Sequence, residues 1–208
     1  MDSTIKKKTI KAMKSKKSYK KELRNKLSAD DVEIVWKEAH RKMAKMLERF
    51  EGIPKGEKTH TDNSIFPTAA IYLTLKERYP DAAYDMVKDI MEKDSKKAGA
   101  TLAKCSRIPG FNRWFLSMWD PVSHKMFGDT CGFKNKFYPK EKGKFKMDIL
   151  ECPYHKYLNL VGCPEINIFF CNNDVNAYGS IPGLKFTRTQ TIGAGGELCD
   201  FNMELVKK

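Results

Sequence analysis

Apolar residues recur at every third or fourth position through the first half of the chain, which is the spacing of helices that bury one face. Over residues 29–50, Ser28 is a candidate N-cap, and one helix face would carry Val32, Val35, Trp36, Ala39, Met43, Met46 and Leu47. Similar spacing predicts helices over 66–79 and 81–91, and residues 96–105 are also compatible with a helix. We therefore expect the first half to be mostly helical.

Strict alternation of apolar and polar residues, which predicts strands, begins only in the last third of the chain. The three segments that show it are 144–149, 184–192 and 198–205. A short glycine-rich loop joins the last two, which is the pattern of an antiparallel hairpin. Between the first strand and the hairpin we expect two short helices, over 153–161 and 164–173, each beginning with proline. The chain is therefore predicted to be an α+β protein, with a helical N-terminal half packed on a C-terminal antiparallel sheet and two short helices inserted.

The segment between residues 109 and 138 is the aromatic-rich part of the chain. Its rings include Phe111, Trp114, Phe115, Trp119, Phe127, Phe133, Phe137 and Tyr138. Such rings can seal helices onto a sheet, or they can line a pocket, which needs apolar walls with a few polar groups. Both interpretations stay open for different rings.

Charge changes this picture only at the N-terminus. The chain of 208 residues has a net charge of +13; its first 26 residues hold eleven basic and two acidic residues, a net +9, which leaves +4 for the rest. A block of like charge at a chain end is typical of a solvated arm. We interpret residues 1–27 as such an arm and residues 28–208 as a single α+β domain. Because the rest of the chain lacks basic residues interleaved with aromatic ones, a nucleic-acid partner is not expected.

The composition also limits where the chain acts and which sites it can form. No run of about 18 apolar residues predicts a membrane-spanning helix, and no apolar stretch follows the basic start as it would in a secretory signal. The six cysteines are therefore expected to be reduced thiols in the cytoplasm. No Cys-x-x-Cys pair occurs, which argues against a zinc ribbon and against a thioredoxin-type pair.

The reactive residue types gather near the C-terminus, and the first of them form a pair. Cys152 ends a predicted strand, and His155 follows three residues later on the same side of a first helical turn. The helix dipole favours a thiolate at that position, and a neighbouring imidazole can act as a base or as a cationic partner. The pair suits a cysteine nucleophile, but a small buried thiol and a surface histidine would show the same spacing.

Cys171 and Asp174 form a second pair, on one face of the next predicted helix. Together with His155 they could hold a divalent metal ion, or Asp174 could orient the histidine. A cysteine in the core and an aspartate that caps a helix or begins a loop are the structural alternative. A divalent metal is therefore only a candidate cofactor.

Cys199 and Arg188 belong to the predicted hairpin. Cys199 shares an apolar strand face with Phe201, which favours core packing, although the adjacent glycine-rich loop could make it reachable from a cleft. Arg188 lies in the middle of its predicted strand, where a guanidinium needs a carboxylate partner from the protein or from a ligand. The glycines at 193–196 lack the Lys-Ser/Thr and the helix that follow a phosphate-binding loop, so a turn is expected there.

Four strings of the sequence carry a resemblance to a known family. They are Glu151-Cys-Pro-Tyr-His155, Phe170-Cys-Asn-Asn-Asp174, Phe186-Thr-Arg-Thr-Gln-Thr-Ile-Gly-Ala-Gly-Gly-Glu-Leu-Cys-Asp-Phe201 and Ile65-Phe-Pro-Thr-Ala-Ala-Ile-Tyr72. With them the chain resembles the L-2-amino-thiazoline-4-carboxylic acid hydrolase family over about residues 30–206. The likeness is strongest at the C-terminal string, and the lysine-rich start lies outside it.

The resemblance implies a hydrolase that opens a cyclic isothiourea, such as 2-amino-thiazoline-4-carboxylate, to an N-carbamoyl amino-acid thiol, here N-carbamoyl-cysteine. Such a site needs a nucleophile or an activated water, an acid for the leaving sulfur and a cation for the substrate carboxylate. By this resemblance Cys152 or Cys199 would be the nucleophile or a metal ligand. His155 would carry the proton, and Asp174 would orient it or be a second metal ligand. The residues that would bind the substrate are Arg188 and Thr189.

Two other functions stay open. The terminal motif also resembles the small-molecule-sensing 4-vinyl reductase-type domains, which implies a non-catalytic domain that binds a small ligand or a metal. The lysine-rich start would instead suit a protein that binds nucleic acid or another acidic partner, but only the charge supports this third function. No oligomeric state is predicted.

Overall fold

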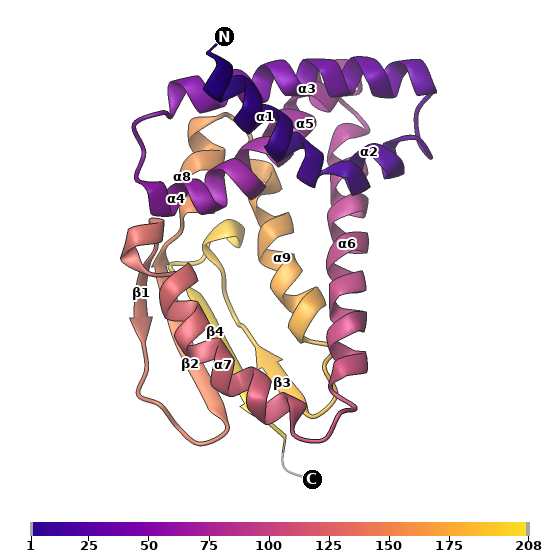
Figure 1. Ribbon diagram of the computed structural model, residues 1–208. Helices are drawn as coiled ribbons and strands as arrows, with labels where there is room; N and C mark the ends of the chain where they lie inside the picture. Colours follow the sequence, from indigo (N-terminus) through magenta and orange to yellow (C-terminus); the bar gives the residue numbers. More distant parts are fainter. Residues whose placement is uncertain (1, 207–208) are drawn as a thin grey trace. The chain divides into compact units, whose positions relative to one another are not determined.

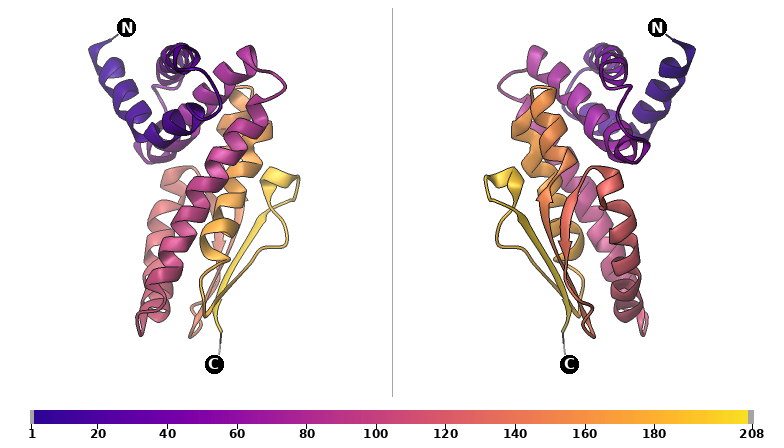
Figure 2. Two further views of the ribbon diagram at one scale, coloured as in Figure 1. Left: turned by 90° about the vertical axis from the view of Figure 1, so that its right-hand side faces the viewer. Right: turned by 90° about the vertical axis from the view of Figure 1, so that its left-hand side faces the viewer.

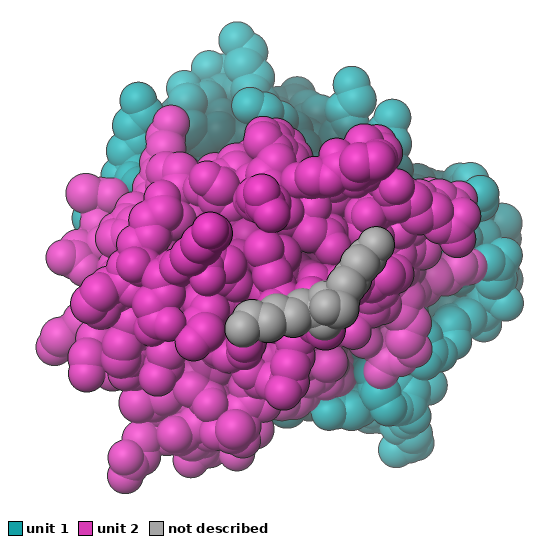
Figure 3. All heavy atoms as spheres, turned by 90° about the horizontal axis from the view of Figure 1, so that it is seen from below, with its two compact units in different colours: residues 1–90, 156–166 teal, residues 91–155, 167–208 magenta. Residues whose placement is uncertain are grey.

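The computed structural model describes residues 2–206, and their contacts divide the chain into two compact units (Figure 3). One unit combines residues up to 90 with residues 156–166, and the other combines 91–155 with residues from 167 onward. The chain passes from one unit to the other within helix α6 (Ala83–Cys105), within helix α8 (Pro153–Leu160) and at the start of helix α9 (Asn167–Tyr178).

The first unit is helical. Its elements are α1 (Ser3–Ser15), α2 (Lys17–Leu23), α3 (Ala29–Arg49), α4 (Lys55–His60), a π-helical segment (Thr61–Ile65), α5 (Phe66–Arg78), the first turns of α6, most of α8 and a 3-10 turn (Pro164–Ile166). Ser28 begins α3, because its side chain accepts the backbone N–H of Asp31 at 3.1 Å. The helices predicted over 29–50 and 66–79 are confirmed.

The lysine-rich start is folded into this first unit. Apolar residues of α1 and α2, among them Ile5, Met13 and Leu23, are buried, whereas Lys7 and Lys14 are exposed. The two helices pack against α3 and against each other. The segment therefore differs from the solvated arm expected from its charge, because its apolar residues share one helix face. A domain boundary at residue 27 stays a prediction.

The second unit contains a four-stranded antiparallel sheet in the order β1–β2–β4–β3 (Figure 1). Its strands are β1 (Lys134–Phe137), β2 (Lys144–Glu151), β3 (Leu184–Thr187) and β4 (Cys199–Leu205). In the central pair, Met147 lies opposite Phe201 and Ile149 lies opposite Cys199. The α+β class, the strand at 144–149 and the antiparallel C-terminal hairpin are thus confirmed.

One face of this sheet is apolar, and helices α7 (Phe111–Met126) and α9 cover it (Figure 2). Its buried side chains are Phe145, Met147, Ile149, Cys199, Phe201 and Met203. Trp119 of α7 stacks on Phe201 with ring centroids 6.1 Å apart, and Tyr178 of α9 meets the same ring edge-on at 6.0 Å. The opposite face carries Lys146, Asp200 and Asn202. The chemistry of the sheet is therefore different on its two faces.

The structure differs from the sequence prediction at five elements, namely α6, α7, β1, β3 and α9. The separate helices expected over 81–91 and 96–105 are one helix, α6. The aromatic-rich segment forms helix α7 and strand β1, neither of which was predicted. Strand β3 ends at Thr187 instead of residue 192, and the helix expected over 164–173 is a 3-10 turn followed by α9, which continues to Tyr178. None of the helices within residues 2–206 is long and apolar enough to cross a membrane.

Candidate functional site

A cavity of about 190 Å³ lies in the second unit between the apolar face of the sheet and α9. Five of the predicted site residues line it: Cys152, Cys171, Cys199, Asp174 and Arg188. Part of its wall is aromatic, with Phe133 from the aromatic-rich segment and Phe201 from β4. The aromatic-rich segment therefore contributes both to packing and to a pocket, since Phe115 packs in the core and Phe133 lines the cavity.

The three thiols reach the cavity from three different elements. Cys152 immediately precedes α8, Cys171 lies on α9 and Cys199 begins β4. All three are free thiols; Cys199 is buried, and the other two are half-buried. Burial raises the pKa of the Cys152 thiol to about 12, although the backbone N–H groups of His155 and Tyr154 at the start of α8 oppose the rise. Cys152 therefore carries a proton at neutral pH.

Thr191, which the sequence did not single out, connects two of these thiols. Its hydroxyl donates to Cys171 Sγ at 3.0 Å, and Cys199 Sγ donates to the same hydroxyl at 3.3 Å. The backbone N–H of Ile192 also donates to Cys199 Sγ, at 3.3 Å. Thr191 is buried, so this short chain of hydrogen bonds is sheltered from water.

Asp174 and Arg188 form the charged pair of the cavity. Arg188 Nη1 donates to Asp174 Oδ2 at 3.2 Å, and the Arg188 side chain is only 7% exposed. Burial raises the pKa of the Asp174 carboxyl to about 6, and the positive charge of Arg188 opposes this rise. The Asp174 side chain remains 39% exposed, so the carboxyl can still exchange protons with solvent. The expected carboxylate partner of Arg188 is thus present within the protein.

His155 and Thr189 do not line the cavity. His155 is exposed, and its Nδ1 lies 3.4 Å from Nδ2 of Asn167, which is itself a lining residue. Asp174 makes its hydrogen bond with Arg188, as described above. His155 thus adjoins the cavity wall, through its ring beside Asn167 and through its backbone N–H at Cys152. Its predicted role as proton carrier stays a prediction.

Thr189 belongs to a loop that the Asp200 carboxylate holds. Asp200 Oδ1 accepts the backbone N–H groups of Thr189 at 2.9 Å and of Gln190 at 2.8 Å, and its Oδ2 accepts the Thr189 hydroxyl at 2.7 Å. Burial alone would raise the pKa of Asp200, but these hydrogen bonds outweigh it and lower the pKa. Asp200 thus replaces the strand partner that residues 189–190 would have had, which explains why β3 is short. Its side chain lies on the face of β4 opposite Cys199, as the alternation predicted.

The glycine-rich loop is pressed onto helix α9. A Cβ atom at Gly193 would lie 2.6 Å from Cys171 Sγ and 2.9 Å from Asn167 Nδ2, closer than any side chain can approach. The loop forms a 3-10 turn at Ile192–Ala194 rather than a phosphate-binding loop. Gly193 is therefore required for the close approach that brings Thr191 to Cys171.

Two asparagines beside the cavity have an oxygen without a hydrogen-bond partner in the described structure. They are Asn167, through its Oδ1, and Asn173, through its Oδ1; both oxygens are buried. A buried acceptor left unpaired costs about 1–3 kcal/mol. Such groups at a cavity wall are suited to accept hydrogen bonds from a ligand. Neither asparagine was predicted, because amide side chains carry no reactivity that a sequence pattern would reveal.

The metal site considered from the sequence has no geometric support within residues 2–206. No group of three His, Cys, Asp or Glu side chains in this part of the chain is arranged to hold a metal ion. Cys171 and Asp174 do line the same cavity, whereas His155 lies outside it. A metal held by these three residues stays a prediction, which elemental analysis of the purified full chain would test.

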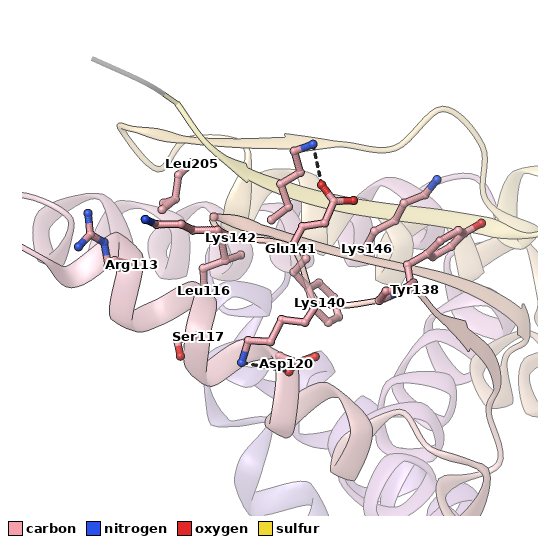
Figure 4. A pocket seen from close by; sticks show the side chains of 14 residues that line it. Arg113, Leu116, Ser117, Asp120, Tyr138, Lys140, Glu141, Lys142, Lys146 and Leu205 are labelled. Atoms are coloured by element: carbon pink, nitrogen blue, oxygen red, sulfur yellow. Dashed lines mark hydrogen bonds and ion pairs between the residues drawn. The ribbon is translucent and has the colours of Figure 1, made fainter.

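A larger cavity, of about 340 Å³, lies elsewhere in the same unit, between α7 and the connection from β1 to β2 (Figure 4). Figure 4 shows Lys140 directed toward Asp120. The Nζ atom of Lys140 lies 3.7 Å from Asp120 Oδ2, and the Nζ atom of Lys144 lies 2.9 Å from Glu141 Oε2. Arg113 also lines this cavity and is exposed to solvent. Among its described lining residues there is no thiol and no imidazole. We therefore place the candidate active site in the smaller cavity, which combines a buried cation, a carboxylate and thiols.

Comparison with known proteins agrees with the resemblance seen in the sequence. The model of one family, described as L-2-amino-thiazoline-4-carboxylic acid hydrolase, matches residues 58–203, which include every residue of the smaller cavity. No curated protein and no solved structure matches the chain significantly. Because the matched segment spans well over half of the sequence, the chain belongs to the L-2-amino-thiazoline-4-carboxylic acid hydrolase family.

Proposed function

We propose that this protein is a hydrolase that opens a small cyclic C–N substrate bearing a carboxylate, with 2-amino-thiazoline-4-carboxylate as the first candidate and N-carbamoyl-cysteine as its product. Membership of the family supports a hydrolase role at a coarse level. The observation that carries the proposal is the convergence of Arg188, Asp174 and three thiols on one cavity of about 190 Å³. A cavity of this size suits a small substrate better than a polymer.

Arg188 is the proposed clamp for the substrate carboxylate. A guanidinium has five N–H donors, and the bond from Nη1 to Asp174 leaves donors for a second carboxylate. Because the Arg188 side chain is almost fully buried, a bond that it makes to a ligand is shielded from water and from salt. Thr189, the other residue predicted to bind substrate, would act indirectly by holding the loop that follows Arg188.

The opposite end of the substrate, where nitrogen and sulfur share one carbon, needs hydrogen-bond acceptors. The amidine-like nitrogens of a 2-amino-thiazoline donate N–H bonds and gain positive charge when protonated. Asp174 and the unpaired oxygens of Asn167 and Asn173 supply acceptors of the required kind.

Asp174 is the proposed proton carrier. With its pKa raised to about 6, the carboxyl is mostly ionised at neutral pH and can accept a proton, yet it returns the proton easily. Its position in the cavity with the thiols favours it over His155, which is exposed and does not line the cavity. His155 would then tune the orientation of Asn167.

The decisive experiment is turnover of 2-amino-thiazoline-4-carboxylate by the purified full chain, followed by release of the free thiol. Arg188→Lys keeps the positive charge but loses the paired N–H donors of the guanidinium. We expect kcat/KM to fall about 10- to 100-fold, because a hydrogen bond to a charged group contributes about 1.5–3 kcal/mol. Arg113→Lys, at an exposed arginine of the other cavity, is the matched control and should leave kcat/KM unchanged. Equal losses in both variants would contradict the assignment of Arg188.

A second candidate function is a non-catalytic domain that binds a small ligand. It is favoured by the raised pKa values of Cys152 and Cys171, because burial keeps these thiols neutral and therefore weakly nucleophilic. Calorimetric titration with the same thiazoline separates the two functions. Saturable binding that Arg188→Lys weakens, without any release of thiol over hours, would favour the binding domain over the hydrolase.

A further inference from the structure

The three thiols of the active-site cavity are not equivalent, and the hydrogen bonds around Thr191 distinguish them. Cys199 donates its S–H to the Thr191 hydroxyl, and that hydroxyl donates onward to Cys171 Sγ at 3.0 Å. Cys171 is therefore the accepting end of the chain. A hydrogen bond to sulfur stabilises negative charge there. Cys199 Sγ also accepts one, from the backbone N–H of Ile192, and Cys152 accepts from backbone N–H groups, but it is Cys171 that accepts from a side-chain hydroxyl.

The surroundings of each thiol point in the same direction. Cys199 is buried at 7% exposure and uses its proton to bond Thr191. Cys152 is held neutral by burial, with a pKa of about 12. Burial raises the pKa of Cys171, and the charges of Cys199 and Asp174 add to the rise. The Thr191 hydrogen bond and the charge of Arg188 oppose it without cancelling it. Cys171 alone combines partial exposure, a hydroxyl donor and a nearby guanidinium.

The proton acceptor lies one helical turn further along α9. Asp174 follows Cys171 at i+3, so both side chains project from one face of the helix into the cavity. Since Cys171 is neutral before the reaction, its proton must leave as the sulfur attacks, and an ionised carboxylate in the same cavity can take it. The arrangement is that of a thiol with its base on one rigid helix.

We propose that Cys171 is the nucleophile of this cavity and that Thr191 is its positioning residue. This inference rests on the proposed hydrolase function and goes further, because it chooses among three thiols and adds a residue from the glycine-rich loop. Gly193 contributes to the same arrangement, because its lack of a side chain allows the loop to place Thr191 against Cys171.

The reaction balances in two steps. In the first, Cys171 Sγ forms a bond to the ring carbon between nitrogen and sulfur and passes its proton to Asp174; the bond from that carbon to the ring sulfur breaks, and Asp174 returns the proton to the departing sulfur. In the second, water adds to the same carbon and gives a proton to Asp174, and the bond to Cys171 breaks. Asp174 then protonates the Cys171 sulfur. One water is consumed, and the product is an N-carbamoyl amino-acid thiol.

The first test measures thiol reactivity and does not require turnover of the substrate. The folded full chain is treated with iodoacetamide at neutral pH, and peptide mass spectrometry follows all six cysteines with time. We expect Cys171 to be labelled before Cys152 and Cys199, and added thiazoline to slow its labelling. Cys105, a half-buried thiol of α6 that does not line the cavity, is the matched control, and its labelling rate should not change with the thiazoline. Faster labelling of Cys152 or Cys199, or equal rates for all thiols, would overturn the proposal.

The second test addresses Thr191. Thr191→Val keeps the shape of the side chain but removes its hydroxyl. We expect the labelling rate of Cys171 and kcat each to fall about tenfold, because the sulfur gains negative charge as it reacts and has lost one hydrogen bond that stabilises this charge. Thr191→Ser restores the hydroxyl and should restore both rates, with KM little changed across the series. If the Val and Ser variants have the same labelling rate and the same kcat, Thr191 is only a packing residue and the positioning role is disproved.

The two proposals fail in different ways. If Cys171→Ser abolishes turnover of the thiazoline while Cys105→Ser does not, the nucleophile is supported together with the hydrolase. If the wild-type protein turns over the thiazoline and Cys171→Ser retains that activity, the nucleophile is wrong and the hydrolase stands. If Cys171 is the fast thiol and yet no thiazoline is opened, the reactive thiol is supported and the proposed substrate is wrong.

Discussion

At the scale of single residues, Gly193 is a position where an added side chain would disturb the site directly. A Cβ there would meet Cys171 Sγ at 2.6 Å and Asn167 Nδ2 at 2.9 Å, so these two side chains would have to move away from the loop that carries Thr191. We expect Gly193→Ala to lower kcat at least tenfold while shifting the urea midpoint of unfolding only slightly, because the clash is local. Gly52→Ala, at a glycine with open space around it, is the control and should change neither quantity.

Asp174 gives the site a defined pH dependence. Its pKa is raised from the ordinary value to about 6, so in the folded protein it takes up a proton as the pH falls through 6, while the unfolded chain stays ionised there. kcat/KM should therefore decline below about pH 6. The Asp174 contribution to stability should be largest below the unfolded pKa and should be lost as the pH rises through about 6.

The measurement is the free energy of unfolding from pH 4 to pH 7, compared between wild type and Asp174→Asn. The variant cannot ionise, so its stability should fall less than that of wild type as the pH rises through this range. A wild-type curve that rises more steeply than the variant curve would mean that the pKa of Asp174 is lowered instead.

The residues of the site were predictable where their side chains are reactive in themselves. Cys152, Cys171, Cys199, Asp174 and Arg188 were all chosen from the sequence, and all line one cavity. Thr191 and the two asparagines were missed, because their contribution depends on where the chain places an ordinary hydroxyl or amide. In a regular strand over 184–192, Thr191 would have pointed with the other threonines away from the apolar face. The strand ends at Thr187, and the loop turns Thr191 inward.

At the scale of elements, helices α1 and α2 show how charge can hide a packing face. The lysines dominated the sequence pattern, yet Ile5, Met13 and Leu23 lie on a buried side. We expect Leu23→Ala to lower the free energy of unfolding by about 2–5 kcal/mol, the usual cost of a cavity at a fully buried leucine. Lys14→Ala, on the exposed side of α1, should change it by less than about 0.5 kcal/mol. Equal small effects would show that the segment is a solvated arm after all.

At the same scale, Asp200 decides where strand β3 ends. Its carboxylate binds two backbone N–H groups and a hydroxyl of residues 189–190, which removes them from the sheet. Asp200→Ala should free the loop, raise hydrogen exchange at Thr189 and Gln190, and lower turnover through Arg188, while β4 keeps its protection. Unchanged exchange at these two amides would contradict this role.

At the scale of the whole molecule, the site is assembled from segments that are distant in sequence. The end of β2, helix α9 and the connection from β3 to β4 each bring one thiol or charge to the same side of the sheet. Periodicity predicted the class, the central strands and most helices, since each follows from a local pattern. It did not predict helices α1, α2 and α4, which lie in strongly polar sequence, nor α7 and β1, where aromatic residues suit a helix and a strand equally. It also did not predict the contact between the glycine-rich loop and α9, which forms only when the chain is folded.

The net charge also acts at this scale, and it leads to a last prediction. Most of the charge of +13 lies on α1 and α2, whose folded faces present lysines together. Lys7, Lys11 and Lys14 are exposed, and the structure gives them no ion pair within residues 2–206. A fixed cluster of this kind attracts any polyanion without regard to sequence. We therefore expect duplex DNA to bind weakly at low salt and to dissociate as salt is added.

Replacing Lys7, Lys11 and Lys14 together by glutamine should reduce the slope of log K against log salt by up to about 3, since each lysine that contacts a phosphate contributes about 0.9. Turnover of the thiazoline should not change, because these residues belong to a different unit from the cavity. The same triple substitution at Lys134, Lys136 and Lys185, exposed lysines of the sheet, controls for the loss of net charge and should weaken binding less. Binding that resists salt or prefers one DNA sequence would instead make nucleic acid a specific partner, because electrostatic attraction alone produces neither.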